Sequence, residues 1–278
     1  MSRLFLLKKI LYNFEMLRGY GSKDILQALK NINLPIYLAK SDVRQRYRRS
    51  TLGPFWITLS TGIMIASIGL IFGNIFKSPM EEFLPFLASG LIFWSFISTV
   101  IIDSTTVFTR SEAIIKQLPL PLFSHVERLI ARNSLILLHN LIILPVVYLV
   151  LHKGVNWFVL LSIFGYILLI SNLAWMSLLI GIICTRYRDL VQIVTSLLQV
   201  VFYVTPIIWM PELLPERASA MVLEANPFFH FLQVVRVPLL GGCPSLSNWI
   251  FTFSICIIGW VITLIIFNKY KHRIAYWL

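Results

Sequence analysis

Long apolar segments without charged residues in their cores dominate this sequence of 278 residues and place it in a lipid bilayer. Hydrophobic residues make up 58% of the chain and charged residues 13%, which excludes a disordered chain and a soluble enzyme of ordinary composition. A helix that crosses a bilayer needs about 20 mostly apolar residues. Six segments meet or nearly meet this length, so we predict an all-α polytopic membrane protein with six transmembrane helices. The predicted spans are Phe55–Phe76, Phe83–Ile102, Leu129–Leu151, Trp157–Cys184, Val191–Ile208 and Trp249–Phe267.

The basic residues fall mostly on one side of these spans. Of the 24 Lys and Arg residues, 20 lie in region 1–54, between spans two and three, between spans four and five, or in the tail 269–278, with Arg132 counted in the loop before it. Because positively charged loops stay in the cytoplasm, both termini are predicted to be cytoplasmic and residues 55–268 to form the membrane domain. This distribution explains the net charge of +12 without any nucleic-acid ligand.

Region 1–54 contains an amphipathic stretch followed by a basic one. Within residues 23–40, four apolar residues recur at helical spacing, which predicts a helix lying in the membrane interface. The basic stretch either anchors the chain by the positive-inside rule or docks anionic headgroups, including the phosphates of a lipid substrate. Arginine suits the second role because its planar fork binds phosphate oxygens in pairs. The apolar residues are Ile25, Leu29, Ile32 and Ile36, and the candidate headgroup residues are Arg44, Arg46, Tyr47, Arg48 and Arg49.

The loop between spans two and three contains a candidate contact helix. Thr109 and Glu112 have the spacing of a helix capping box, and Pro119 would end the helix that follows. We therefore expect a short cytoplasmic helix that could insert into a groove of a soluble partner. The alternative is a solvated loop with a chance cap.

The segment between spans five and six is too apolar for an ordinary loop and is interrupted by prolines. Its pieces Ala218–Leu223 and Phe228–Leu240 are too short to cross the bilayer, so we predict re-entrant helices that dip in and return. Aromatic residues gather here and at the end of span five, either as interfacial belts and packing groups or as the wall of a glycan pathway. The candidate pathway residues are Trp56, Phe202, Tyr203, Trp209, Phe228 and Phe229.

Groups for catalysis, metal binding or nucleotide binding are missing from the sequence pattern. The cores of the predicted spans contain no Asp, Glu, Lys or Arg, and no GxxxxGK[ST] or HExxH motif occurs. We predict no catalytic residues, no metal site and no cofactor in this chain, so a second polypeptide must supply energy for uphill transport. The polar residues within spans are interpreted as helix–helix hydrogen-bonding groups; they are His139, Asn140, Asn172, Gln192 and Gln199.

Several motifs, in order along nearly the whole chain, match one family. The chain resembles the membrane-spanning subunit of type-2 ABC exporters, in the branch that exports polysaccharides, and is similar to O-antigen permeases. The Leu118-Pro119-Leu120-Pro121 stretch departs from the Phe-Pro pair that relatives often carry there. The matching motifs are residues 42–56 (DVRQRYRRSTLGPFW), 114–119 (IIKQLP), 186–189 (RYRD), 205–207 (TPI), 226–227 (NP) and 276–278 (YWL).

The resemblance implies a homodimer in the bacterial inner membrane, bound to two copies of a cytoplasmic ABC ATPase that holds ATP and Mg. The implied substrate is a polysaccharide of the O-antigen type on an undecaprenyl-type diphosphate lipid, exported between the two first and fifth spans. Asp24–Ala39 would be the amphipathic gate helix, and Pro211–Leu240 the external re-entrant helices. The implied ATPase-coupling residues are Ser111, Glu112, Ile114, Ile115, Lys116 and Gln117.

Three other interpretations remain open at this point. One is a type-2 exporter of teichoic acid, capsule, a drug or a small lipid. Another is a membrane-embedded enzyme acting on lipid-linked sugars, which the absence of acids within the spans disfavours. The third is a structural or assembly subunit without a transport role.

Overall fold

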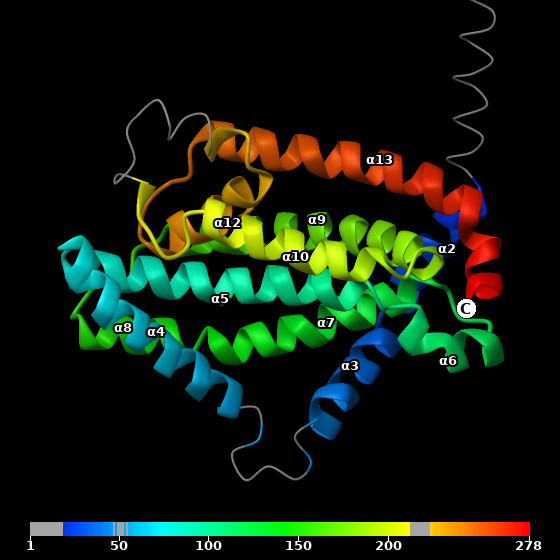
Figure 1. The fold of residues 1–278 in the computed structure, drawn as a ribbon, viewed down its shortest axis with the longest axis horizontal. Helices are drawn as coiled ribbons and strands as arrows, with labels where there is room; N and C mark the ends of the chain where they lie inside the picture. Colours follow the sequence, from blue (N-terminus) through cyan, green and yellow to red (C-terminus); the bar gives the residue numbers. More distant parts are fainter. Residues whose placement is uncertain (1–18, 47, 49–52, 54, 212–222) are drawn as a thin grey trace, which may run out of the picture.

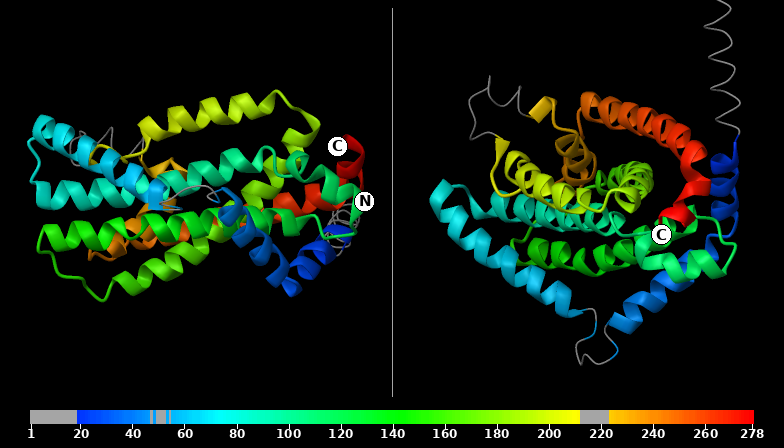
Figure 2. Two further views of the ribbon diagram at one scale, coloured as in Figure 1. Left: turned by 90° about the horizontal axis from the view of Figure 1, so that it is seen from below. Right: turned by 45° about the vertical axis from the view of Figure 1, so that its right-hand side comes forward.

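The computed structural model describes residues 19–46, 48, 53, 55–211 and 223–278, and within these residues every regular element is a helix (Figure 1). The helices form an elongated bundle (Figure 2). Five segments are long and apolar enough to cross a membrane. They are α4 (Phe55–Phe76), α5 (Met80–Ser104), the combined α7 and α8 (Phe123–Val150), α9 (Val159–Arg186) and α13 (Leu246–Trp277).

The predicted fifth span forms a shorter helix than expected. Helix α10 (Leu190–Val204) has 15 residues, which gives about 22 Å at 1.5 Å per residue, short of the roughly 30 Å hydrocarbon core. It ends because Thr205 adopts an extended conformation directly before Pro206, where proline disfavours helical backbone in the preceding residue. Five of the six predicted spans therefore form helices of spanning length. The crossing of the membrane by Val191–Ile208 stays a prediction.

Two prolines divide helices that the sequence pattern predicts as continuous. The predicted gate helix Asp24–Ala39 is two helices, α2 (Tyr20–Lys30) and α3 (Asn33–Arg46). The third span is likewise divided into α7 (Phe123–Asn140) and α8 (Ile143–Val150). A proline ring clashes with the carbonyl group four residues earlier. Pro35 and Pro145 place that carbonyl at residues 31 and 141, where the breaks occur.

Helix α5 forms the centre of the bundle. In its most apolar stretch 78% of the residues are buried, against 17% for α4. It contacts α4, α7, α9, α10 and α12 (Pro227–Leu239), and Figure 1 shows it running through the middle of the molecule. The predicted short helix Phe228–Leu240 is thus a buried element packed against the spans, whereas most of Ala218–Leu223 lies outside the described residues.

Helices α9 and α13 pack closely through a small residue and a polar network. Gly259 of α13 lies against the ring of Trp175, with no room for a Cβ atom. The Trp175 indole N–H donates to Asn172 Oδ1 (3.1 Å), and Asn172 Nδ2 donates to the Thr252 carbonyl oxygen of α13 (3.3 Å). The prediction that Asn172 joins helices is confirmed.

Candidate functional site

The candidate coupling residues form an exposed helix at one end of the bundle. Helix α6 (Glu112–Gln117) follows the 3₁₀ turn η1 (Thr109–Ser111) and lies at the same end as α2, α3 and the C-terminus (Figure 1). We call this the α6 end, and residues 109–117 the coupling segment. Glu112 and Lys116 form an i,i+4 ion pair of 2.6 Å on its surface. The helix stops at Leu118, which is extended before Pro119, as predicted.

The predicted capping box does not form. Thr109 belongs to the 3₁₀ turn, and its hydroxyl donates to the Thr106 carbonyl oxygen (3.1 Å). The residue that precedes α6 is Ser111, which makes no side-chain cap bond. A capping residue needs a non-helical, extended backbone, and the chain leaves α5 through tight turns that deny Thr109 this conformation.

Asp24 fixes helix α2 to the rest of the bundle. Its buried carboxylate accepts the backbone N–H groups of Leu122 (3.1 Å) and Phe123 (3.0 Å), where α7 begins. Lys271 of α13 lies 3.0 Å from the same carboxylate. Asp24 therefore caps a helix that starts 99 residues later. The sequence analysis missed this role, although an acid in a basic amphipathic stretch was a usable signal.

Two further carboxylates bind the arginines of α7. Arg128 and Asp42 of α3 form a bidentate pair. Arg128 Nε donates to Asp42 Oδ2 (2.7 Å) and Nη2 donates to Oδ1 (2.5 Å), a geometry typical of strong Arg–carboxylate pairs. Asp103, at the end of α5, binds Arg132 (2.6 Å) and Arg110 of the coupling segment (3.2 Å). These pairs connect α3, α5, α7 and the coupling segment.

The same residues line a polar cavity of about 680 Å³ at the α6 end, which we call the arginine cavity. Its walls come from α3, the end of α5, the coupling segment and α7. Four guanidinium groups face two carboxylates across it. The ionisable side chains in its wall are Arg46, Arg110, Arg128, Arg132, His125, Asp42 and Asp103.

The candidate headgroup residues separate in the structure. Arg46 is exposed at the end of α3 and lines the arginine cavity. Arg44 and Arg48 are also exposed but are not part of that wall. Tyr47 and Arg49 lie outside the described residues.

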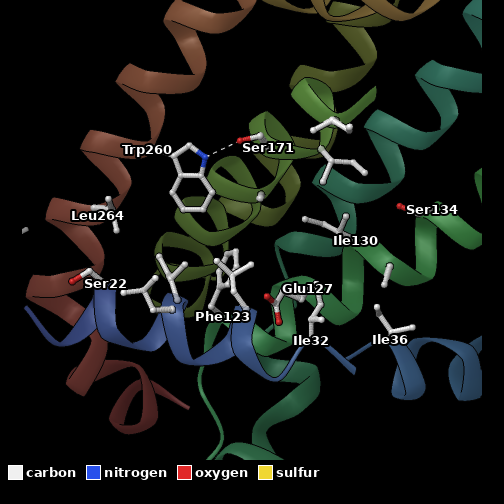
Figure 3. Close-up of a pocket in the computed structure, with 17 residues that line it drawn as sticks. Ser22, Ile32, Ile36, Phe123, Glu127, Ile130, Ser134, Ser171, Trp260 and Leu264 are labelled. Atoms are coloured by element: carbon white, nitrogen blue, oxygen red, sulfur yellow. Dashed lines mark hydrogen bonds between the residues drawn. The ribbon is translucent and has the colours of Figure 1, made fainter. Parts of the chain in front are cut away.

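An apolar groove of about 780 Å³ runs between α2, α3 and the spans α7, α9 and α13 (Figure 3). All four residues of the predicted apolar face line it: Ile25, Leu29, Ile32 and Ile36. The Trp260 indole N–H donates to Ser171 Oγ (3.1 Å) in its wall, and Glu127 stands at the α2 side. The four apolar residues therefore lie along the groove between α2, α3 and the spans, while the position of this region in the membrane interface stays a prediction.

The aromatic candidates gather around a residue that the sequence analysis did not select. Trp94 of α5 is buried and contacts Phe202 and Phe228, with ring centroids 5.9 and 5.8 Å apart. Tyr203 stacks edge-on against Phe202 (5.2 Å) but is 68% exposed. The contacts of Phe202 and Phe228 are those of packing groups, while Tyr203 presents an open aromatic face.

The remaining aromatic candidates lie on other parts of the chain. The Trp209 indole N–H donates to the Tyr203 carbonyl oxygen (3.1 Å), which keeps Trp209 near the end of α10. Phe229 contacts the His230 ring. Trp56 is 57% exposed at the start of α4, on a separate element from the Trp94 cluster.

Arg236 is a fully buried arginine within α12 that the sequence analysis did not select. It donates to the Pro206 carbonyl oxygen (2.7 Å), and its guanidinium lies 4.0 Å from the centre of the Phe86 ring. Buried charges in membrane proteins usually have a defined partner, and here the partners join α12 to α5 and the end of α10. A single arginine in an apolar run was the available signal.

Comparison with known proteins identifies the family of this chain. The family described as ABC-2 type transporter matches residues 36–240, most of the chain. The chain belongs to the ABC-2 type transporter family. Among curated relatives, an O-antigen export system permease protein RfbA of Klebsiella pneumoniae is 24% identical over 252 residues, covering 87% of this chain and 94% of the relative. The protein of the same name from Myxococcus xanthus is 22% identical over 195 residues, covering 70% and 75%.

The ABC-2 match includes the elements that form the candidate site. It begins within α3 and ends just after α12, so it contains the coupling segment, the whole arginine cavity wall and the Trp94 cluster. Helices α2 and α13 lie outside the matched range. The family is one of transporters, which favours a transport subunit over the embedded-enzyme and structural alternatives.

Proposed function

We propose that this ABC-2 permease is the membrane subunit of an ATP-driven exporter that moves a polysaccharide of the O-antigen type, carried on an undecaprenyl-type diphosphate lipid, across the bacterial inner membrane. The observation that carries this proposal is the similarity to O-antigen export permeases over 87% of the chain. The earlier motif resemblance points to the same branch.

The partner ATPase would bind at the coupling segment. Helix α6 projects at the basic α6 end without a buried residue of its own, which leaves its surface available to a groove on a soluble protein. Two copies of a cytoplasmic ABC ATPase would bind the dimer and hold ATP and Mg. The chain itself has no P-loop motif, so hydrolysis belongs to the partner.

The α6 end would face the cytoplasm. Four helices with basic residues reach this end (Figure 1). They are α6 with Lys116, α7 with Arg128, α9 with Arg186 as its last residue, and α13 with Lys271. By the positive-inside rule, this orientation puts α2 and the C-terminus on the cytoplasmic side and α12 toward the opposite face. The N-terminus, which lies outside the described residues, is proposed to be cytoplasmic as well.

A second copy of the chain would pack against α4 and α10. Helix α4 is little buried, and α10 exposes an apolar stripe at intervals of three and four residues: Ile193, Leu197, Val200 and Val204. Two such surfaces facing each other would enclose a path between the first and fifth spans. Tyr203 lies beside this stripe, and its ring is suited to pack against the C–H faces of sugars.

Deletion of the gene in its host, followed by fractionation of lipid-linked glycan, tests the proposal. We expect finished polymer to accumulate on the cytoplasmic side while the cell surface loses it, with both effects reversed by a plasmid copy. Unchanged surface glycan and an unchanged internal pool would contradict the polysaccharide function. A drug or small-lipid exporter would then be examined through sensitivity profiles of the same deletion strain.

A further inference from the structure

We infer that the arginine cavity is the binding site for the diphosphate group of the lipid-linked substrate. The inference rests on the proposed function and makes it specific, because it selects residues beyond the basic stretch 44–49. Arg110, Arg128 and Arg132 join Arg46 in one wall although they are far apart in the sequence.

The charge of the cavity favours a doubly negative ligand. Both carboxylates in the wall are already bound, Asp42 by Arg128 and Asp103 by Arg132 and Arg110. Four guanidinium groups against two carboxylates leave an excess of two positive charges. Arg46 makes no ion pair with any other described residue. Its guanidinium is therefore available to phosphate oxygens, which it can bind in pairs.

A buried histidine is part of the cavity wall. His125 lines the cavity and is only 5% exposed. Within the described part of the chain, its Nε2 atom is buried and has no hydrogen-bond partner. Buried polar atoms are normally satisfied, but Nε2 is enclosed by protein, so a ligand in the cavity would bond to it only after the ring turns.

The size and position of the cavity fit this ligand. A volume of about 680 Å³ falls within the range of about 300–1,000 Å³ typical of small-molecule sites. The cavity lies beside α3, which is packed on the membrane domain, so a lipid headgroup could reach it from the bilayer interface. A ligand held by Arg46 and Arg110 would also connect α3 to the coupling segment.

Direct binding tests this assignment. The purified permease–ATPase complex in nanodiscs of phosphatidylcholine, with its nucleotide sites filled by a non-hydrolysable ATP analogue, is titrated with farnesyl diphosphate. The test variant is Arg46→Gln with Arg110→Gln, which leaves Asp103 bound to Arg132. The matched control is Arg44→Gln with Arg48→Gln, which removes the same charge from exposed positions outside the cavity.

We expect the test variant to weaken binding at least tenfold and the control less than twofold. Equal losses in the two variants, or no binding by the wild-type complex, would overturn the assignment. If the double variant does not assemble with the ATPase, Arg46→Gln alone is measured, with an expected loss of at least threefold against Arg44→Gln alone.

Competition identifies the chemistry that is recognised. Inorganic pyrophosphate should displace farnesyl diphosphate from the wild-type complex, which supports recognition of the diphosphate itself. If nanodiscs containing phosphatidylglycerol abolish the binding of farnesyl diphosphate, the cavity is a general site for phospholipid headgroups and the diphosphate assignment is wrong.

The cavity and the exporter function can fail separately. Normal binding together with unchanged surface glycan in the deletion strain would refute the polysaccharide function and leave a site for diphosphate lipids. Loss of surface glycan on deletion, together with undiminished binding by the test variant, would refute the cavity and leave the function standing.

Discussion

Single carboxylates at the α6 end stabilise contacts between helices that are remote in sequence. Asp24 is the clearest case, because its one buried side chain binds the start of α7 and the ammonium group of Lys271. Asp42 and Asp103 act similarly through arginine pairs. Removing one member of such a group leaves buried donors without acceptors, which costs more than the net value of the bond itself.

Substitution of Asp24 should therefore destabilise the protein. Asp24→Ala removes the acceptor for two N–H groups and one ion-pair partner of Lys271, and we expect a loss of about 2–4 kcal/mol. Asp24→Asn keeps one acceptor oxygen and should lose less. Thermal unfolding of the purified protein in detergent measures the difference.

The matched control is Glu112→Gln, which breaks an exposed i,i+4 pair. Exposed pairs contribute little, so its unfolding temperature should stay close to the wild-type value. If Asp24→Ala unfolds no earlier than this control, the capping role of Asp24 is wrong.

At the scale of elements, close approach between helices depends on small residues at defined places. Helix α13 lies against α9 where Gly259 meets the Trp175 ring. By contrast, a Cβ atom added at Gly62 of α4 would meet nothing within 4 Å. The same substitution should therefore have opposite effects at these two positions.

Gly259→Ala should destabilise the bundle by about 1–3 kcal/mol, because the added methyl group forces the two helices apart or moves the indole ring. Gly62→Ala should be neutral or slightly stabilising, since alanine favours the helix. Thermal unfolding of both variants, with fluorescence of Trp175 and the other tryptophans as the signal, measures this difference. Equal unfolding temperatures would show that Gly259 is not required for the α9–α13 contact.

The coupling segment allows an element-scale prediction about the partner. Lys116→Pro removes a backbone donor within α6 and should break this six-residue helix. We expect the variant to lose most of its co-purification with the ATPase subunit while still inserting in the membrane. Lys116→Ala, which removes the same charge but keeps the helix, should retain the ATPase. Retention by both variants would place the contact elsewhere.

At the scale of the whole molecule, the exposed apolar surfaces of α4 and α10 determine how two copies would meet. One copy leaves most of α4 and the α10 stripe uncovered. Lipid alone could cover such surfaces, but an export path needs a second wall. The proposed dimer supplies it by placing α4 and α10 of each copy around a common axis.

Cysteine cross-linking in membranes tests this arrangement. In a chain whose three native cysteines are replaced by serine, Val200→Cys on the α10 stripe should form disulfide-linked dimers under mild oxidation. Phe164→Cys on α9, which is similarly exposed, is the control and should remain monomeric on denaturing gels. Cross-linking through Phe164→Cys but not Val200→Cys would place the interface on α9.

The features predicted correctly from the sequence depend on local chemistry. Apolar length determines which segments can cross a bilayer, and five of the six predicted spans form helices of spanning length. The exposed helix 112–117 ends before Pro119 as predicted. The breaks at residues 31 and 141 follow from Pro35 and Pro145, so the sequence contained the information for both although the prediction treated each helix as continuous.

The tertiary structure decided what depends on residues far apart in the chain. Thr109 has the spacing of a cap, yet the turn that leaves α5 gives it the wrong backbone. Asp24, Asp42 and Arg236 look like ordinary charges in the sequence, and only packing supplies partners 98, 86 and 30 residues away. The arginine cavity has the same origin, because charges from four elements converge only when the helices assemble. Local sequence therefore determined the membrane-spanning helices and their basic end, while long-range packing determined the site.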